Sequence, residues 1–217
     1  MAAEKLRRAA VTLPMSTPAP ESIDRLPEAA IAVLEFWFGA RTDPRWGQQR
    51  REWFRKTAAF DAQVRTRFGA LVEQGLRAEL GEWAGPWGTL AHIVLLDQFP
   101  RHVYRGDPRA FAGDALALAL ARQMVARRDD ATLPATPRSF AYMPFEHAED
   151  LAMQNEAVRL FSALEAADPS SAHSRDYAER HRAVIARFGR FPHRNAVLGR
   201  ASTPEELEFL RLRGSKF

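Results

Sequence analysis

The stretch "FDAQVRTRFGALVEQGLRAEL", residues 60–80, repeats large apolar side chains at intervals of three and four positions. An α-helix turns once every 3.6 residues, so side chains at this spacing fall on one face. The stretch therefore predicts an amphipathic helix that packs one side against a core. The residues on that face are Phe60, Val64, Phe68, Leu71 and Val72.

The same spacing recurs along the rest of the chain, and strand-like alternation is almost absent. Helix-start signals accompany it. Pro27 opens "LPEAAIAVLEFWFG", and residues 203–206, Thr-Pro-Glu-Glu, have the pattern of a capping box. The segment "DALALALARQMVARR", residues 114–128, is apolar almost all round in its first half, as in a helix buried between others. We predict about eight or nine helices with short loops, in an all-α fold of stacked antiparallel helix pairs.

The composition predicts one globular domain. The chain has 217 residues, of which 46% are hydrophobic, and a chain of this length can bury a sizeable core. Residues 1–22 lack helical periodicity and hold three separated prolines, so we predict a loose tail there and a single all-helical domain over residues 23–217. No apolar run approaches the ~20 residues that cross a bilayer, and no secretory signal is evident at the start. We therefore expect a soluble, cytoplasmic protein without a membrane partner.

Cysteine content and charge exclude several functions. The chain contains no cysteine, which rules out disulfides, thiolate zinc sites and a cysteine nucleophile. No HExxH-like spacing is present, and we predict neither a metal site nor a cofactor. The net charge of +4 is small and no nucleic-acid-binding motif appears, so a nucleic-acid partner is not favoured. The sequence leaves the oligomeric state open.

The densest positive charge lies in "ARFGRFPHRNAVLGR", residues 186–200, which has four arginines and one histidine but no acid. Its acidic counterpart is "YMPFEHAEDLAMQ", residues 142–154, where acids surround His147. One interpretation is a capped, solvated helix start, since acids are favourable there. The other is that the two segments face each other across a cleft. Both interpretations stay open at this point. The acids are Glu146, Glu149 and Asp150.

Two Phe-Pro pairs are each expected to break a helix. Proline disfavours helix at the residue before it, so Phe99 and Phe191 should end helices while Pro100 and Pro192 begin short turns. After the second pair, free backbone amides are expected to point outward, as at any helix N-terminus, where they can meet an anion. These amides belong to His193, Arg194 and Asn195.

Two polar residues interrupt apolar helical stripes. Asp97 falls on the stripe of "TLAHIVLLDQF", and His181 falls on that of "YAERHRAVIARF". A buried carboxylate is costly unless a cation or donor meets it. Asp97 therefore predicts a partner, either Arg101 on its own helix or an arginine of residues 180–200. His181 fits either a satisfied core histidine or a catalyst.

Five stretches carry a family resemblance: "VLEFWFG", "WFRKTAAFD", "LLDQFPRHVYRGDPRAFAGDALALA", "FAYMPFEHAEDLAMQNEAVRLF" and "HRAVIARFGRFPHRNAVLGRASTPEELEFL". Through them the chain resembles the bacterial domain-of-unknown-function family 924 over residues 27–212. The resemblance implies an α-α superhelix similar to tetratricopeptide-repeat proteins, and no known reaction, cofactor or substrate. His102 and Thr57 depart from the family pattern and are left out of the site. The matching motif positions are Asp97, Gln98, Pro100, Arg101, Glu146, His147, Glu149, Asp150, His181, Arg182, Arg187, Arg190, His193, Arg194 and Asn195.

Three functions follow from these residues. The first is binding of an anionic ligand, a carboxylate- or phosphate-bearing metabolite or an acidic peptide, in a cleft lined by arginine, histidine and acids. The second is a hydrolase-like small-molecule enzyme that uses histidine and carboxylate for acid–base chemistry in the same cleft. The third is nucleic-acid binding. The expected ligand-binding residues are Arg101, Glu149, Asp150, Arg182, Arg187, Arg190, Arg194 and Asn195. The candidates for acid–base chemistry are His147, His181, His193, Asp97 and Glu146.

Overall fold

A computed structural model describes residues 23–53 and 55–215, and the tail expected over residues 1–22 lies outside them. The described residues contain nine α-helices and no strand, which confirms the all-α prediction. None of these helices is both long and apolar enough to cross a bilayer. The helices are α1 (Glu28–Phe38), α2 (Ala58–Leu76), α3 (Gly85–Ile93), α4 (Phe99–Val103), α5 (Asp114–Arg127), α6 (Ala135–His147), α7 (Leu151–Ala167), α8 (Ala172–Phe188) and α9 (Pro204–Leu210).

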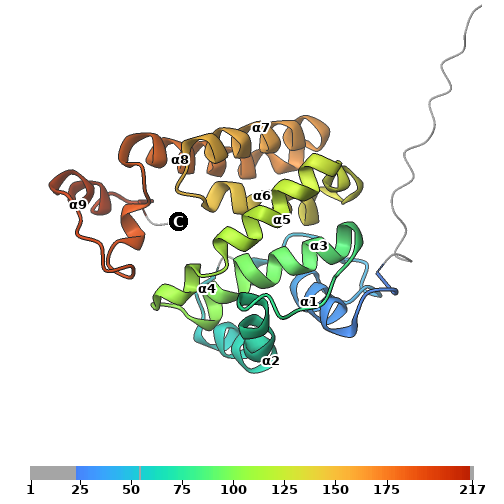
Figure 1. The fold of residues 1–217 in the computed structure, drawn as a ribbon. Helices are drawn as coiled ribbons and strands as arrows, with labels where there is room; N and C mark the ends of the chain where they lie inside the picture. The colour runs from blue at the N-terminus through green and yellow to red at the C-terminus, as the bar shows by residue number, and fades with distance from the viewer. Residues whose placement is uncertain (1–22, 54, 216–217) are drawn as a thin grey trace, which may run out of the picture.

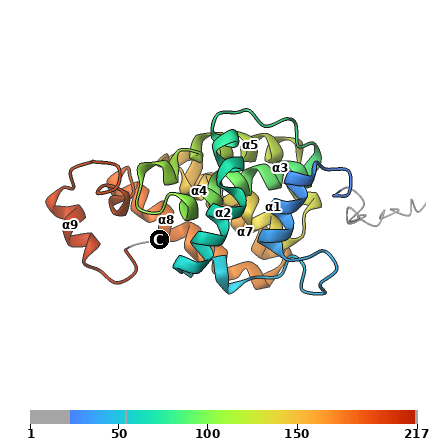
Figure 2. The same ribbon diagram turned by 90° about the horizontal axis from the view of Figure 1, so that it is seen from below.

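The helices form a packed body with a projecting C-terminal end (Figure 1). A short 3₁₀ turn, Pro169–Ser171, folds α8 back along α7, and α6 packs on the same pair. Helix α5 lies between α6 and α3. Residues 189–215, which we call the C-terminal arm, leave the end of α8 and place α9 away from the body (Figure 2). The predicted antiparallel pairs are therefore present, while a tetratricopeptide-like superhelix stays a prediction.

One continuous apolar core joins α1 to α8. Aromatic rings make up much of its centre, and Trp37 lies 5.5 Å from Phe99 and 5.7 Å from Phe140 in tilted and edge-on contacts. A second, smaller cluster of Ile185, Phe191 and their neighbours packs the base of the arm onto α8. The arm therefore has its own apolar anchor, separate from the main core.

Helix α2 shows the predicted amphipathic packing. Val64, Phe68 and Val72 are buried in the main core, as the spacing of residues 60–80 predicted. Thr57 begins the helix, because its side chain accepts a hydrogen bond from the Phe60 amide at 3.3 Å. This capping role gives Thr57 a structural function outside the candidate site.

The chain stays helical through Phe99, so the expected break at this Phe-Pro pair is wrong. Between α3 and α4 the backbone forms a π-helical segment, Val94–Gln98, in which the Phe99 amide bonds to the Val94 carbonyl five residues back. Pro100 has no N–H for the Leu96 carbonyl, and a widened turn accommodates its ring without ending the helix. The π segment contains Gln98 and the fully buried Asp97.

Gly113 fits against this π segment. A Cβ atom at Gly113 would lie 2.2 Å from the Leu96 carbonyl oxygen, which is backbone and cannot rotate away. We therefore expect Gly113→Ala to lower the free energy of unfolding by about 2–3 kcal/mol, measured by urea titration. Gly69→Ala in α2 is the matched control, because a Cβ there meets no atom within 4 Å. Alanine is the better helix former, so the control should be at least as stable as wild type. Equal stability of both variants would contradict the close packing.

Helix α8 ends earlier than expected. It stops at Phe188 rather than at Phe191, because Gly189 adopts the left-handed conformation, with φ of 69°, that closes helix C-termini. Pro192 does begin a short 3₁₀ turn, Pro192–Arg194, as predicted. The arm therefore starts with a glycine stop followed by a proline turn.

Candidate functional site

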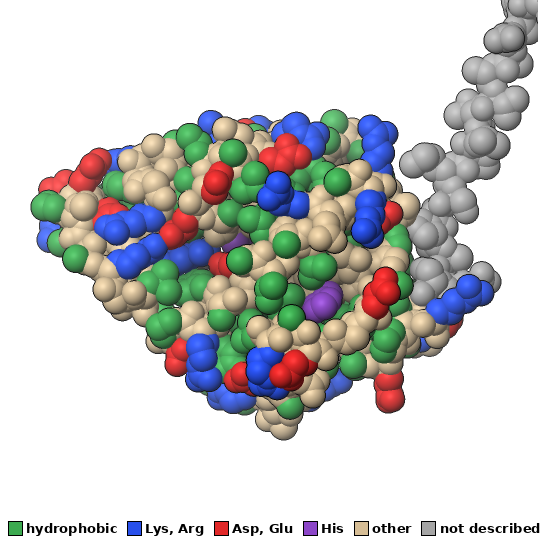
Figure 3. All heavy atoms as spheres, viewed as in Figure 1, with side chains coloured by type: hydrophobic (Ala, Val, Ile, Leu, Met, Phe, Trp, Pro, Cys, Tyr) green, Lys and Arg blue, Asp and Glu red, His purple; other side chains and the backbone are tan. Residues whose placement is uncertain are grey.

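An open cavity of about 280 Å³ lies between the arm, the start of α5 and the end of α6. Figure 3 shows basic and acidic side chains gathered around a hollow between the arm and the helical body on this face. One part of the cavity wall is apolar and the other is charged. The lining residues are Phe111, Asp114, Ala115, Leu118, Pro144, His147, Ala148, Glu149 and Arg194.

A buried carboxylate holds the histidine of this cavity. The Asp97 side chain is 0% exposed, and its Oδ1 lies 2.7 Å from His147 Nδ1 and 3.3 Å from Arg101 Nη2. Gln98 Nε2 donates to the other oxygen at 2.5 Å. Burial alone would raise the pKa of Asp97, but attraction to His147 and Arg101, with these hydrogen bonds, lowers it below its usual range. The partner predicted for Asp97 on its own helix is confirmed.

The ionised Asp97 fixes the proton on the His147 ring. A carboxylate only accepts hydrogen bonds, so His147 Nδ1 must carry a proton. His147 lines the cavity, and among the described residues its ring makes no other hydrogen bond. In the neutral ring, Nε2 is then the unprotonated nitrogen and can accept a proton from a bound molecule. This arrangement is that of a general base oriented by a buried acid.

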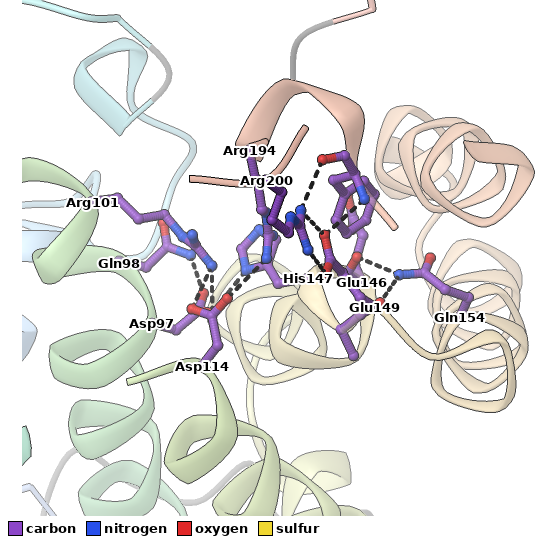
Figure 4. A network of polar contacts seen from close by, with 12 residues as sticks. Asp97, Gln98, Arg101, Asp114, Glu146, His147, Glu149, Gln154, Arg194 and Arg200 are labelled. Carbon is purple, nitrogen blue, oxygen red and sulfur yellow. Dashed lines mark hydrogen bonds and ion pairs between the residues drawn. The ribbon is translucent and has the colours of Figure 1, made fainter. Parts of the chain in front are cut away.

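Asp114 joins two arginines in the cavity wall (Figure 4). Its Oδ1 accepts from Arg101 Nη2 at 2.9 Å, and its Oδ2 accepts from Arg194 Nη1 at 3.2 Å. Arg194 has a side chain that is only 8% exposed, stacked between the rings of Phe111 and Phe191 at 4.7 and 4.6 Å. Burial, reinforced by the nearby charge of Arg101, lowers the pKa of Arg194 to about 10, so it remains charged at neutral pH.

Glu149 attaches the arm to the body. Arg200 binds it through two nitrogens, with Nη1–Oε2 at 2.5 Å and Nη2–Oε1 at 2.8 Å, and the Phe191 amide donates to Oε1 at 2.8 Å. Burial would raise the pKa of Glu149, but these donors outweigh it and lower the pKa. The basic and acidic segments therefore contact each other, as one interpretation of the sequence proposed.

Two of the three backbone amides expected to meet an anion, those of Arg194 and Asn195, are not open, so the expectation is wrong for these two. The Arg194 amide donates to the Phe191 carbonyl and the Asn195 amide to the Pro192 carbonyl, both at 3.0 Å. A 3₁₀ turn closes its hydrogen bonds within three residues and leaves fewer amides free than an α-helix does. The Phe191 amide, at the start of this turn, donates to Glu149.

Two other histidine candidates have different surroundings. His181 Nδ1 lies 2.8 Å from Glu146 Oε1 and 2.9 Å from the Tyr177 carbonyl, and both side chains of this His–Glu pair are buried. The pair ties α6 to α8 inside the body. Burial, with the charge of Arg194, lowers the pKa of His193 to about 3, which makes it a weak base. His147 is the histidine of the cavity wall.

Five residues expected to bind ligand have other positions, and we leave them out of the site. Arg187 pairs with Glu205 at 2.9 Å, and Arg190 and Asn195 bind Glu206 at 2.7 and 3.2 Å, so these contacts hold α9 to the end of α8 and to the first part of the arm. Asp150 caps α7 by accepting from the Met153 amide, and Arg182 is exposed on α8. The acidic partners of Arg187 and Arg190 lie on α9, later in the chain, and the charge pattern of the basic segment does not predict them. The five are Asp150, Arg182, Arg187, Arg190 and Asn195.

Sequence reasoning missed Asp114 and Phe111. An aspartate in the first turn of a helix is a common capping choice, so Asp114 gave no sign of a second role. Phe111 precedes it in a 3₁₀ turn, Pro108–Phe111, and looked like an ordinary apolar residue. The available signal was indirect, because Asp114 lies inside one of the family motifs.

A second buried charge cluster lies in the body. Asp61 on α2 binds His102 Nδ1 at 2.8 Å and Arg105 Nη2 at 2.7 Å. The His102 ring also packs edge-on against Phe60 at 5.1 Å. This cluster ties α2 to the end of α4 within aromatic packing, and it does not line the cavity.

The described residues form an all-helical fold with a small cavity where an arginine-rich arm meets the helical body. A family model of bacterial proteins of unknown function, DUF924, matches residues 33–214, and the chain belongs to this family. The chain is also similar to the solved structure of the protein of unknown function ATU0120 from Agrobacterium tumefaciens, with 39% identity and a TM-score of 0.72. That match covers 84% of this chain and 96% of the other. No curated protein matches the chain.

Proposed function

We propose that this chain binds a small molecule through a carboxylate or phosphate group, in the cavity beside His147 and Arg194. The observation that carries the proposal is the incomplete hydrogen bonding of the Arg194 guanidinium. Its nearly buried guanidinium lines the cavity, and among the described residues it donates only through Nη1, to Asp114, so that Nη2 has no acceptor. A buried donor without an acceptor is unfavourable. The oxygens of an anionic group supply such acceptors and match the planar fork of arginine.

The size and wall of the cavity favour a metabolite. Its volume of about 280 Å³ is near the lower end of small-ligand sites, which span ~300–1,000 Å³. Phe111, Leu118 and Pro144 form an apolar side that can cover a carbon skeleton. A cavity of this size suits a single small molecule better than an acidic peptide or a nucleic acid.

Arg194→Lys tests this proposal. We expect succinate, citrate, inorganic phosphate or glycerol 3-phosphate to raise the melting temperature of the wild-type protein, because a ligand of the native state stabilises it. Arg194→Lys should weaken the dissociation constant of the best of these by about 10-fold or more, since an ammonium keeps the charge but cannot form the fork. Binding is measured by isothermal titration calorimetry.

Arg187→Lys is the matched control. Arg187 lies in the same basic segment but pairs with Glu205, outside the cavity. The control should bind the ligand as wild type does. Equal dissociation constants for wild type and Arg194→Lys would locate the ligand elsewhere and overturn the proposal.

Acid–base catalysis on the bound molecule is a second candidate function. The observation that favours it is the Asp97–His147 contact of 2.7 Å, with His147 in the cavity wall and Asp97 fully buried behind it. His147 would act as the base and Asp97 would orient it, while Arg194, which lines the same cavity, would hold the anionic group.

A further inference from the structure

The charges around the cavity balance one another. Arg194, Asp114 and Glu149 lie in its wall, Arg101 supports Asp114, and Arg200 supports Glu149. With Asp97 added, three arginines face three carboxylates, so these fixed charges sum to zero when His147 is neutral. In a partly enclosed site of low dielectric, these fixed charges compensate a ligand with a single negative charge less fully than a ligand whose own charges balance. A cavity whose surrounding charges sum to zero therefore suits a ligand whose own positive and negative charges are equal.

Asp114 can receive the positive end of such a molecule. A carboxylate has about four lone-pair positions, and Asp114 uses one oxygen for Arg101 and the other for Arg194. Its side chain keeps 20% of its surface exposed and lines the cavity. The oxygens of Asp114 therefore have room for an ammonium donor. Arg194 Nη1 is only 3.2 Å from Asp114 Oδ2, so the positions for an anion and a cation are adjacent.

We infer that the ligand is a zwitterion of the α-amino-acid type. In such a molecule the ammonium and the carboxylate sit on one carbon, which matches the neighbouring positions of Asp114 and Arg194. The carboxylate pairs with Arg194, the ammonium with Asp114, and the apolar side formed by Phe111, Leu118 and Pro144 contacts the side chain. This inference rests on the proposed function, because it needs the carboxylate to bind at Arg194.

Matched ligands test the inference on the wild-type protein. We would titrate L-leucine and L-phenylalanine at pH 7.5, each beside its N-acetyl derivative, which lacks the cation, and its amide, which lacks the carboxylate. At least one free amino acid should bind about 10-fold or more tightly than both of its derivatives, which corresponds to losing one charged contact.

Asp114→Asn tests the residue that we assign to the ammonium. The variant keeps the shape of the side chain. The ratio of the dissociation constant of the N-acetyl form to that of the free amino acid should fall towards one. Asp107→Asn is the control, because Asp107 caps the neighbouring 3₁₀ turn and does not line the cavity. Its preference should match wild type. If Asp114→Asn fails to fold, as its melting curve will show, the wild-type comparison alone decides.

Each outcome separates the inference from the proposed function. N-acetyl derivatives that bind as tightly as free amino acids would overturn the zwitterion and leave the anion site standing. Binding of succinate or phosphate with no binding of any amino acid would do the same. Amides that bind as tightly as free amino acids would show that no carboxylate is needed, which overturns both.

Discussion

Replacing Asp97 with alanine is expected to lower the free energy of unfolding by about 3–5 kcal/mol, because removing one partner of a buried ion pair strands the other. Asp97 is fully buried and contacts both Arg101 and His147. Urea titration measures the change. Asp97→Asn should lose less, since the amide keeps one acceptor oxygen. The exposed Glu79→Ala, which removes a surface pair with Arg77, should leave the midpoint unchanged.

The same residue predicts a pH dependence. The pKa of Asp97 is lower in the folded protein than the value of about 3.9 for an unfolded chain, so the folded state binds fewer protons around that pH. The stabilisation is then fully present above about pH 4 and is lost as pH falls towards the lower folded pKa. The difference in free energy of unfolding between wild type and Asp97→Asn should therefore become smaller below pH 4. A gap that stays constant from pH 7 to pH 3 would contradict the ionised state of Asp97.

Replacing His147 with glutamine is expected to lower kcat for any reaction at this site by about 10²–10⁴-fold, the usual contribution of a general acid or base. Binding through Arg194 should change little, so the loss should fall on kcat rather than on the dissociation constant. The measurement incubates the compounds that raise the melting temperature with wild type, His147→Gln and His173→Gln, and follows products by NMR. His173 is exposed on α8 and serves as the control. Equal product rates in all three proteins would exclude His147 as the base.

Asp97 acts in this scheme as a positioning residue, and the ring nitrogens of His147 report on it. Nitrogen-15 NMR should find the neutral His147 ring protonated on Nδ1 in the wild-type protein. Asp97→Asn should shift the ring towards a mixture of tautomers, because an amide can donate as well as accept. A wild-type ring protonated on Nε2 would show that the contact between Asp97 and His147 does not orient the base.

Much of the fold follows from local sequence patterns. The buried face of α2, the capping box of α9 and the proline turn at Pro192 were all predictable, because each depends on residues within a few positions of one another. Thr203 and Glu206 form both hydrogen bonds of the capping box. The pairing of Asp97 with Arg101 was also predictable, because a carboxylate on an apolar stripe needs a partner and Arg101 lies one turn further along the same helix.

The site depended on the tertiary structure. The four arginines of the basic segment are evident in the sequence, but the acid that each one binds is not. The pairs are Arg187–Glu205, Arg190–Glu206, Arg194–Asp114 and Arg200–Glu149. The charge of a side chain does not specify its partner, so from the sequence any of these arginines could have paired with any acid. Arg194 and Asp114 are 80 positions apart, and only the packing of the arm against α5 brings them together. The π segment also depends on the tertiary structure. Pro100 by itself predicts a break in the helix, whereas in the packed molecule Gly113 leaves room for a widened turn.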